Sequence, residues 1–368
     1  MTVSISGTNG VTFPDNSLQT AAASPFGLKN RLINADMRID QRNAGASVTI
    51  TTTGLDYAVD RFFAQGSVTS KFTAQRSSTA PTGFTNSLLF TSSAATTPSS
   101  SDYYYFSQRI EGTNTYDLDF GLSTAKTITI SFWVRSSLTG TFSGVVLNSA
   151  VNRSYAFTYT ISSANTWEQK SVTITGDTSG TWLTTTGVGL EVRFALGAGS
   201  SFLQSSGSWG TGNVVGATGT TQWISTNGAT FYITGVQLEI GSTATPFERR
   251  MYGQELALCQ RYFTLIASGD LKSTGVGYYY SATSAYGNFN LPVTMRTTPT
   301  IYQTTGTDYY RLYRNSNNDG VNSFTVGDGT TPQSLEFLNS SEASGTAGQA
   351  GFWRTGSASS YLAVQAEL

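Results

Sequence analysis

The sequence contains no histidine, one cysteine and few charged residues. Charged residues make up 12% of its 368 positions, against about 25% in an ordinary soluble domain. Without histidine, the chain lacks the usual general base, the Ser-His-Asp triad and the commonest transition-metal ligand. The single thiol, Cys259, cannot form an intrachain disulfide, so packing must hold the fold together. We therefore expect no catalytic residues, no metal site and no cofactor.

The balance of charge and hydropathy excludes further classes. The chain carries 21 basic and 22 acidic residues, so it has no basic excess to neutralise phosphates and we expect no nucleic-acid binding. No segment approaches the run of about 20 apolar residues that a membrane span needs. The opening residues 1–7 lack the charged and apolar regions of a secretory signal, which predicts synthesis in the cytosol without Sec export.

Hydroxyl residues, glycines and aromatic residues replace the missing charge. Serine and threonine supply about a quarter of the chain, well above average usage. Between Asn30 and Glu248, short runs alternate polar and apolar residues and are separated by turn-forming residues, which predicts β-strands. We expect strands near residues 47–53, 61–65, 67–76, 87–93, 103–111, 127–136, 141–148, 154–162, 168–175, 190–196 and 230–240. Strands at this spacing predict a jelly-roll β-sandwich.

Within two of these runs the alternation also predicts which side chains face the core. In residues 127–134, one face carries Ile128, Ile130, Phe132 and Val134, which we assign to the interior. In residues 230–240, the alternation changes phase at Gly235, which predicts a β-bulge there.

The periodicity changes after Pro246. Tyr252, Leu256, Cys259 and Phe263 fall at helical spacing and predict a short helix with these residues on its apolar face. Alternation then resumes in eight runs that predict a second, smaller sandwich: residues 275–281, 286–291, 300–305, 309–313, 323–326, 334–338, 351–355 and 361–366. The chain is thus expected to be all-β, with an N-terminal extended tether (1–27), a central jelly roll (28–248), a linking helix (249–264) and a C-terminal β-sandwich (265–368).

Several motifs resemble those of bacteriophage tail-fibre and tail-collar proteins. Residues 10–21, GVTFPDNSLQTA, are similar to the strip G-[VI]-x-F-P-D-G-[ST]-x-Q-T-x-A, with Asn16 where that family commonly has glycine. Residues 30–42 and 57–62 resemble the opening N-x-L-x-N-x-x-F…Q-R…Y-x-x-D-R-[WF] of phage structural proteins. Residues 231–263 resemble their sequel [TG]-x-V-Q-L-E-x-G…A-T-P-F-E…C-x-R-Y-[FY], and residues 291–300 and 366–368 resemble their C-terminal region. The motifs follow the family's order along nearly the whole chain.

This resemblance implies a virion tail fibre, commonly a homotrimer, with a carbohydrate-binding-module-like jelly roll and a β-rich tip. It places the N-terminal segment against other phage tail proteins. The candidate attachment residues there are Val11, Phe13, Pro14 and Leu18. The resemblance further implies that the tip binds a polysaccharide or lipopolysaccharide of the host surface.

Carbohydrate binding also suits the composition, because aromatic faces stack on sugar rings while hydroxyls and amides bond ring hydroxyls. The candidate glycan-binding residues of the C-terminal sandwich are Tyr278, Tyr280, Tyr309, Tyr310, Tyr313 and Trp353. Strand alternation places Tyr279 on the opposite face from Tyr278 and Tyr280. These tyrosines could instead line a trimer interface, where tyrosine is also enriched.

Another candidate, Trp209, lies in a glycine-rich loop, residues 197–221. This loop could clasp a neighbouring subunit, which we favour, or present Trp209 to a ligand.

Enzymatic activity is not expected. A glycosidase needs two carboxylates across a cleft. The nearest pairs in sequence are Asp56 with Asp60, Asp117 with Asp119, and Glu239 with Glu248. No fixed-period repeat of the kind found in β-helical tailspikes is present. The oxygen-rich residues 315–320 could bind Ca²⁺, but we favour a hairpin turn with Asp319 and Gly320 at its apex.

Two other classes of protein are compatible with these patterns. The first is a purely structural virion component, such as a tail adaptor, head fibre or capsid decoration. The second is a secreted carbohydrate-binding module, which the missing signal sequence disfavours.

Overall fold

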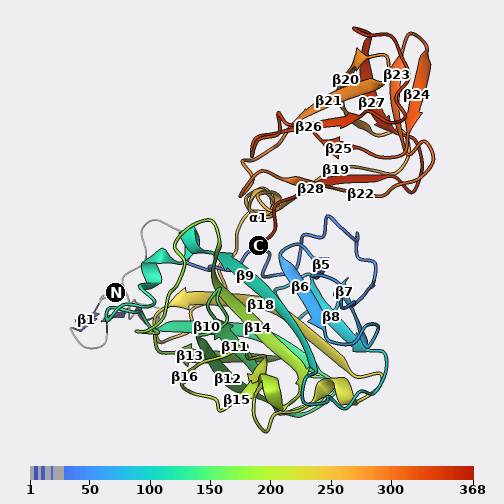
Figure 1. Ribbon diagram of the computed structural model, residues 1–368. Coiled ribbons are helices and arrows are strands. Elements are labelled where there is room, and N and C mark those ends of the chain that lie inside the picture. The colour runs from blue at the N-terminus through green and yellow to red at the C-terminus, as the bar shows by residue number, and fades with distance from the viewer. Residues whose placement is uncertain (1–3, 7–9, 13–17, 20–28) are drawn as a thin grey trace.

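The computed structural model describes residues 29–368 and, before them, the three short strands β1 (Ser4–Ser6), β2 (Gly10–Thr12) and β3 (Leu18–Gln19), which form one sheet. Residues 29–368 form two β-sandwiches that meet at the single α-helix, α1 (Tyr252–Gln260) (Figure 1). The all-β fold predicted from the sequence is therefore confirmed. Among the residues described, no helix is both long enough and apolar enough to cross a membrane.

The first sandwich is the predicted jelly roll and consists of two facing sheets. Sheet I has the strand order β13 (Glu168–Ile174), β10 (Ile128–Ser136), β18 (Thr230–Ile240), β8 (Ser87–Ser92), β7 (Phe72–Ser77) and β4 (Val48–Thr49). Sheet II has the order β16 (Trp209–Gly210), β12 (Ser154–Ile161), β11 (Gly140–Leu147), β14 (Val188–Ala198), β9 (Tyr103–Glu111), β6 (Phe62–Gly66) and β5 (Asp56–Val59). Short 3-10 turns connect some strands: η1 (Gly112–Asn114), η2 (Tyr116–Leu118), η3 (Ser200–Phe202) and η4 (Trp223–Ser225).

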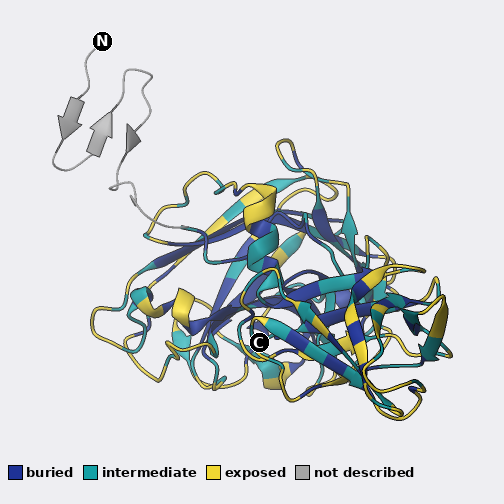
Figure 2. Cartoon of the chain, turned by 90° about the horizontal axis from the view of Figure 1, so that it is seen from above, coloured by how far each residue is buried: buried dark blue, intermediate teal, exposed yellow. Residues whose placement is uncertain are grey.

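Aromatic side chains fill the space between sheets I and II. Phe106 of β9 stacks on Phe90 of β8 at 4.4 Å between ring centroids and on Phe194 of β14 at 5.1 Å. Ile128, Ile130, Phe132 and Val134 are fully buried, as the alternation predicts. Figure 2 shows the same pattern, with buried residues on the strands inside the molecule and exposed ones on the connecting loops.

The predicted bulge is present at Gly235. The register between β10 and β18 shifts between the pairs Ser131–Gln237 and Trp133–Thr234. Gly235 has φ of 60°, and a Cβ added there would lie 2.6 Å from the Phe84 ring. Glycine is required here both by the backbone conformation and by this close approach.

We expect Gly235→Ala to lower the free energy of unfolding by about 1–3 kcal/mol, because it adds backbone strain and a steric clash. Gly228→Ala is the matched control, since Gly228 also has positive φ but no atom lies within 4 Å of an added Cβ. Urea unfolding of both variants measures the difference. Equal losses would show that the contact with Phe84 contributes nothing.

The second sandwich consists of a small and a large sheet. Sheet III has the order β19 (Phe263–Ser268), β28 (Tyr361–Gln365) and β22 (Thr300–Gln303). Sheet IV has the order β24 (Asn317–Val321), β23 (Tyr310–Arg314), β27 (Ala350–Thr355), β20 (Ser273–Ser281), β21 (Ser284–Asn290), β26 (Ser334–Asn339) and β25 (Thr325–Val326).

The hairpin between β23 and β24 corrects one prediction. Its turn is formed by Asn315 and Ser316, which both have positive φ, and not by Asp319 and Gly320. Asp319 lies within β24 and accepts hydrogen bonds from the Tyr279 hydroxyl and the Ser344 amide. The turn lies at Asn315 and Ser316 because a type I′ hairpin needs positive φ at both central residues.

The helix α1 also differs from its predicted face. Cys259 is buried as expected, but Tyr252 is exposed and the second fully buried side chain is Glu255. Glu255 is paired with the buried Arg250. This ion pair joins α1 to the end of the first sandwich, where Arg250 also donates to the Leu32 carbonyl.

Two buried ionic clusters form the junction between the sandwiches. In the first cluster, the Glu111 carboxylate of sheet II accepts hydrogen bonds from Arg261 at 2.6 Å and from the Tyr262 hydroxyl at 2.8 Å. Burial alone would raise the pKa of Glu111, but these two donors outweigh it and hold the pKa below its ordinary value. Glu111 therefore stays ionised at neutral pH.

In the second cluster, Glu367 pairs with Arg61 and, at 3.0 Å, with Arg42. Both arginines also stack on rings of the helix end: the Arg42 guanidinium lies 3.7 Å from the Phe263 centroid and that of Arg61 lies 3.6 Å from the Tyr262 centroid. The junction is thus held by charges that are largely removed from solvent.

Candidate functional site

The outer face of sheet II carries a groove, and its floor follows from strand alternation. On β9, Tyr104 and Phe106 point into the core, so Tyr103, Tyr105 and Ser107 point outward. Tyr105 lies beside Ala195 of β14 and Gln65 of β6 in the strand register. The floor therefore brings together side chains from three neighbouring strands.

The glycine-rich segment 197–221 forms one wall of this groove. It contains the short parallel pair β15 (Leu203–Gln204) and β17 (Gly216–Ala217), and it buries Val214, Val215 and Ala217 against sheet II. Phe202 of this segment packs edge-on against Tyr103, with centroids 5.1 Å apart. The segment thus covers part of its own sheet, and the clasp on a neighbouring subunit stays a prediction.

The resulting cavity has a volume of about 300 Å³, which is within the usual range for small-ligand sites. Its lining residues are Gln65, Tyr103, Tyr105, Arg109, Val151, Arg193, Phe202, Asn213 and Val215. Aromatic rings and polar groups are therefore combined in a single hollow, which is the composition expected of a polar-ligand site.

A hydrogen-bond network holds these polar groups in place. The Tyr105 hydroxyl donates to Gln65 Oε1 at 2.5 Å. The Glu191 carboxylate accepts from Ser107 Oγ at 2.9 Å and from Arg193 Nε at 2.8 Å. Arg193 Nη1 in turn donates to Asn213 Oδ1 at 2.7 Å, so the network ties the floor of the groove to its wall.

The network also sets the charge states of the groove. Burial raises the pKa of Tyr105 to about 12, so its hydroxyl stays neutral and remains a donor. Burial would raise the pKa of Glu191 as well, but Arg193 and Arg109 outweigh it and keep that pKa below its ordinary value. Glu191 is therefore a carboxylate beneath two guanidinium groups.

The candidate residues of the C-terminal sandwich lie in different environments. Tyr278 and Tyr280 are 44% and 71% exposed on the outer face of sheet IV, and both pack against Tyr286. Tyr279 faces the core, as alternation predicts. Tyr313 is half-buried on the outer face, parallel to Phe352 with ring centroids 5.8 Å apart. This outer face, which we call the tip face, brings Tyr278, Tyr280 and Tyr313 onto one sheet.

Three of the candidates belong to the interior or its edge. Tyr310 and Trp353 are fully buried, so they pack the second core and we withdraw them as ligand contacts. Tyr309 is half-buried against the same core. Alternation along β23 and β27 accounts for these positions, because neighbours of an outward residue must point inward.

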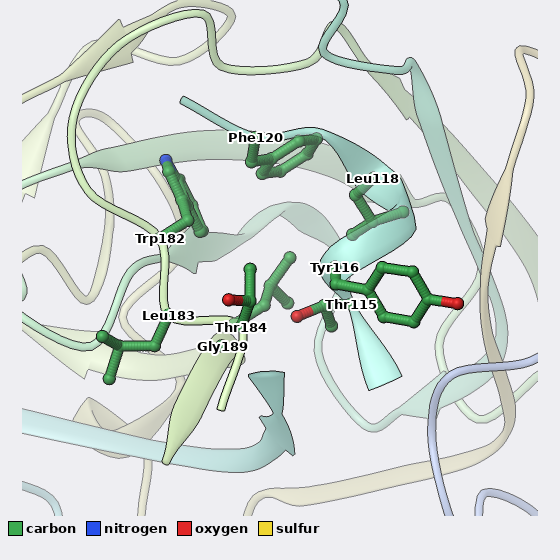
Figure 3. A pocket seen from close by; sticks show the side chains of 9 residues that line it. Thr115, Tyr116, Leu118, Phe120, Trp182, Leu183, Thr184 and Gly189 are labelled. Atoms are coloured by element: carbon green, nitrogen blue, oxygen red, sulfur yellow. The ribbon is translucent and has the colours of Figure 1, made fainter. Parts of the chain in front are cut away.

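Trp209 lies away from the groove in a cluster of aromatic rings. It packs edge-on against Tyr155, Phe120 and Trp182, and its indole nitrogen donates to the Thr175 carbonyl at 2.7 Å. A small pocket opens between Phe120, Trp182 and the η2 turn (Figure 3). Its volume of about 20 Å³ has room for roughly one water molecule and is too small for a sugar ring.

The remaining candidates are placed as follows. Val11 lies on β2 and Leu18 on β3, whereas Phe13 and Pro14 fall outside the described residues. The carboxylates considered for catalysis are all paired within the chain: Asp56 with Thr51, Asp60 with Gln41, Asp117 with Arg31, Asp119 with Lys126, Glu239 with Thr245, and Glu248 with Asn30. Within residues 29–368, no cluster of three metal-ligating side chains occurs.

Comparison with known proteins adds a likeness of fold over part of the chain. No family model and no curated protein matches the sequence. Among solved structures, a putative sugar-binding protein from Bacteroides thetaiotaomicron VPI-5482 matches at 13% identity over 58% of this chain and 100% of that one, with a TM-score of 0.34. A family 11 carbohydrate-binding module from Clostridium thermocellum matches at 11% identity over 55% of this chain and 100% of that one, with a TM-score of 0.28.

The enzymatically active domain of tailspike protein 4 of bacteriophage CBA120 matches at 13% identity over 58% of this chain, with a TM-score of 0.30. The chain spans about a fifth, 21%, of that tailspike chain.

Proposed function

We propose that the chain is a non-enzymatic, glycan-binding appendage of a phage particle, namely a tail fibre, and that the groove on sheet II binds a saccharide. The observation that carries this proposal is the 300 Å³ cavity in which Tyr103 and Tyr105 lie beside the amides of Gln65 and Asn213. Sugar rings present apolar faces and several hydroxyls, so they need both kinds of group at once.

The other parts of the chain have roles consistent with this function. The N-terminal segment, residues 1–27, attaches the fibre to the tail, as the resemblance of residues 10–21 implies. The tip face, with Tyr278 and Tyr280 exposed, offers a second surface for a host polysaccharide or lipopolysaccharide. A homotrimer repeated around the tail multiplies weak sites into firm attachment.

One observation favours a structural alternative for the tip face. Val276 is 68% exposed next to Tyr278, Tyr280 and Phe352 on the same sheet, and such a row of apolar and tyrosine side chains also suits a subunit interface. In that case the chain would be a tail adaptor, head fibre or capsid decoration, and its tyrosines would make protein contacts.

We expect Tyr103→Ala to weaken binding of host surface polysaccharide by about tenfold or more, since a ring that contacts the ligand is removed from the groove. Isothermal titration calorimetry of the purified full chain measures this. Tyr116→Ala is the matched control, because Tyr116 is 64% exposed on the same sandwich but lies outside the groove. Tyr280→Ala tests the tip face separately. If the folded protein binds no saccharide, the structural alternative replaces our proposal.

A further inference from the structure

Two arginine side chains, Arg109 and Arg193, line the groove. Among the described residues, the carboxylate side chain bonded to both is that of Glu191, which lies beneath the floor. Arg193 and Arg109 share this one carboxylate, at 2.8 Å and 3.2 Å. Arg109 also bonds the main-chain oxygen of Leu368, the last residue of the sequence, whereas Glu191 is the one carboxylate bonded to Arg193 among the described residues.

The bonding pattern leaves part of each guanidinium available. Glu191 engages the Nε atom of both arginines. The Nη1 atom of Arg193 donates to Asn213 and to the Val214 carbonyl, and that of Arg109 donates to the Leu368 carbonyl at 2.7 Å. The Nη2 atoms of Arg193 and Arg109 form no hydrogen bond with any described residue. Neither atom is buried without a partner, so both are accessible.

Arg193 is the better placed of the two. Its side chain is only 5% exposed, yet it lines the cavity and is held by bonds to Glu191 and Asn213. Its guanidinium also lies 4.7 Å from the centroid of the Tyr105 ring. A fixed, largely desolvated guanidinium recognises a carboxylate strongly, because its free Nη2 group is already oriented and the hydrogen bond it donates is charge-assisted.

We infer that the groove selects an acidic saccharide, whose sugar carboxylate is bound by the Nη2 group of Arg193 with Arg109 beside it while the ring lies against Tyr103. This inference rests on the proposed function and specifies its substrate class. A neutral sugar could use Tyr103 and the amides but would offer no charged partner to the accessible Nη2 groups of Arg193 and Arg109.

The test compares one saccharide in its acidic and neutral forms on the unaltered full chain. Oligogalacturonide and its methyl ester have the same sugar chain, and the carboxylate of the first is a neutral methyl ester in the second. By calorimetry we expect the acid to bind at least about tenfold more tightly than the ester, the effect of one charge-assisted contact. We also expect the acid, but not the ester, to bind more weakly as salt is added.

Substitutions at Arg193 test whether this residue causes the preference for the acid. Arg193→Gln should abolish the preference for the acid, and Arg193→Lys should keep part of it, because the charge remains but the planar guanidinium held by Glu191 and Asn213 does not. Arg135→Gln on the outer face of sheet I is the matched control and should leave the preference unchanged.

The two proposals can fail separately. Equal binding of acid and ester, with loss of both in Tyr103→Ala, would overturn the acidic preference and leave glycan binding at the groove intact. If the folded protein binds neither form and no surface polysaccharide, both proposals are overturned.

Discussion

Glu367→Gln is expected to weaken the docking of the two sandwiches by about 3–5 kcal/mol, the cost of removing one partner from a buried ion pair. Glu367 is the only acidic group bonded to Arg61 among the described residues, and the Arg61 side chain is 2% exposed. Glutamine keeps the size of the side chain but leaves the positive charges of Arg61 and Arg42 uncompensated. If the two sandwiches separate, both arginines regain contact with water. The destabilisation caused by the substitution therefore cannot exceed the free energy of docking.

Two measurements distinguish separation from general unfolding. Calorimetry should show one thermal transition for the unaltered chain and two for the Glu367→Gln variant, and limited proteolysis should cut the variant near α1. The matched control is Asp270→Asn, which neutralises an exposed carboxylate that bonds no described residue. A single unshifted transition in Glu367→Gln would show that the junction does not depend on this charge.

Phe106→Ala is expected to lower the free energy of unfolding of the jelly roll by about 3–5 kcal/mol, the range for truncating a buried phenylalanine. Phe106 is fully buried and stacks between Phe90 and Phe194, so its loss leaves a cavity between the two sheets. Tyr105 and Ser107 flank it on β9, and saccharide binding should therefore weaken together with stability.

Denaturant unfolding, followed by tryptophan fluorescence, measures this loss. Phe106→Leu should cost less because most of the volume is kept. Phe352→Ala, at a ring 40% exposed on the tip face, should change stability by under about 1 kcal/mol. An equal loss in Phe106→Ala and Phe352→Ala would contradict the view that the stacked rings form the centre of the first core.

The sequence predicts most strands well because alternation is a local signal. The prediction for residues 103–111 and 230–240 coincides with β9 and β18, and the inward residues of β10 are buried as expected. Six strands within residues 29–368 lie outside the predicted runs: β5, β15, β16, β17, β19 and β24. β15, β16 and β17 have two residues each, and the alternation of β19, which begins inside the predicted linking helix, is interrupted by a register shift between Leu265 and Ala267. β5 is only four residues long, and β24 is the polar sequence NNDGV, so neither shows a clear period of two.

The groove could not be predicted in the same way. Tyr105, Arg193 and Gln65 come from strands that are far apart in the sequence and meet only through the strand order of sheet II. The sequence does contain one signal of the groove: the charged residues Arg109, Glu191 and Arg193 lie among apolar residues inside predicted strands. On the tip face, alternation separates Tyr279 from its neighbours. The same alternation places Tyr310 and Trp353 inside, opposite to the outward Tyr313 and Phe352.

The junction has a consequence for the order of folding. Arg61 and its partner Glu367 are 306 positions apart, and Arg42 is 325 positions from the same carboxylate. Contacts between such distant residues form late, because the cost of closing a long loop precedes their gain. We therefore expect each sandwich to fold as its own cooperative unit, with docking as a final, slower step during which the arginines of the junction are still hydrated.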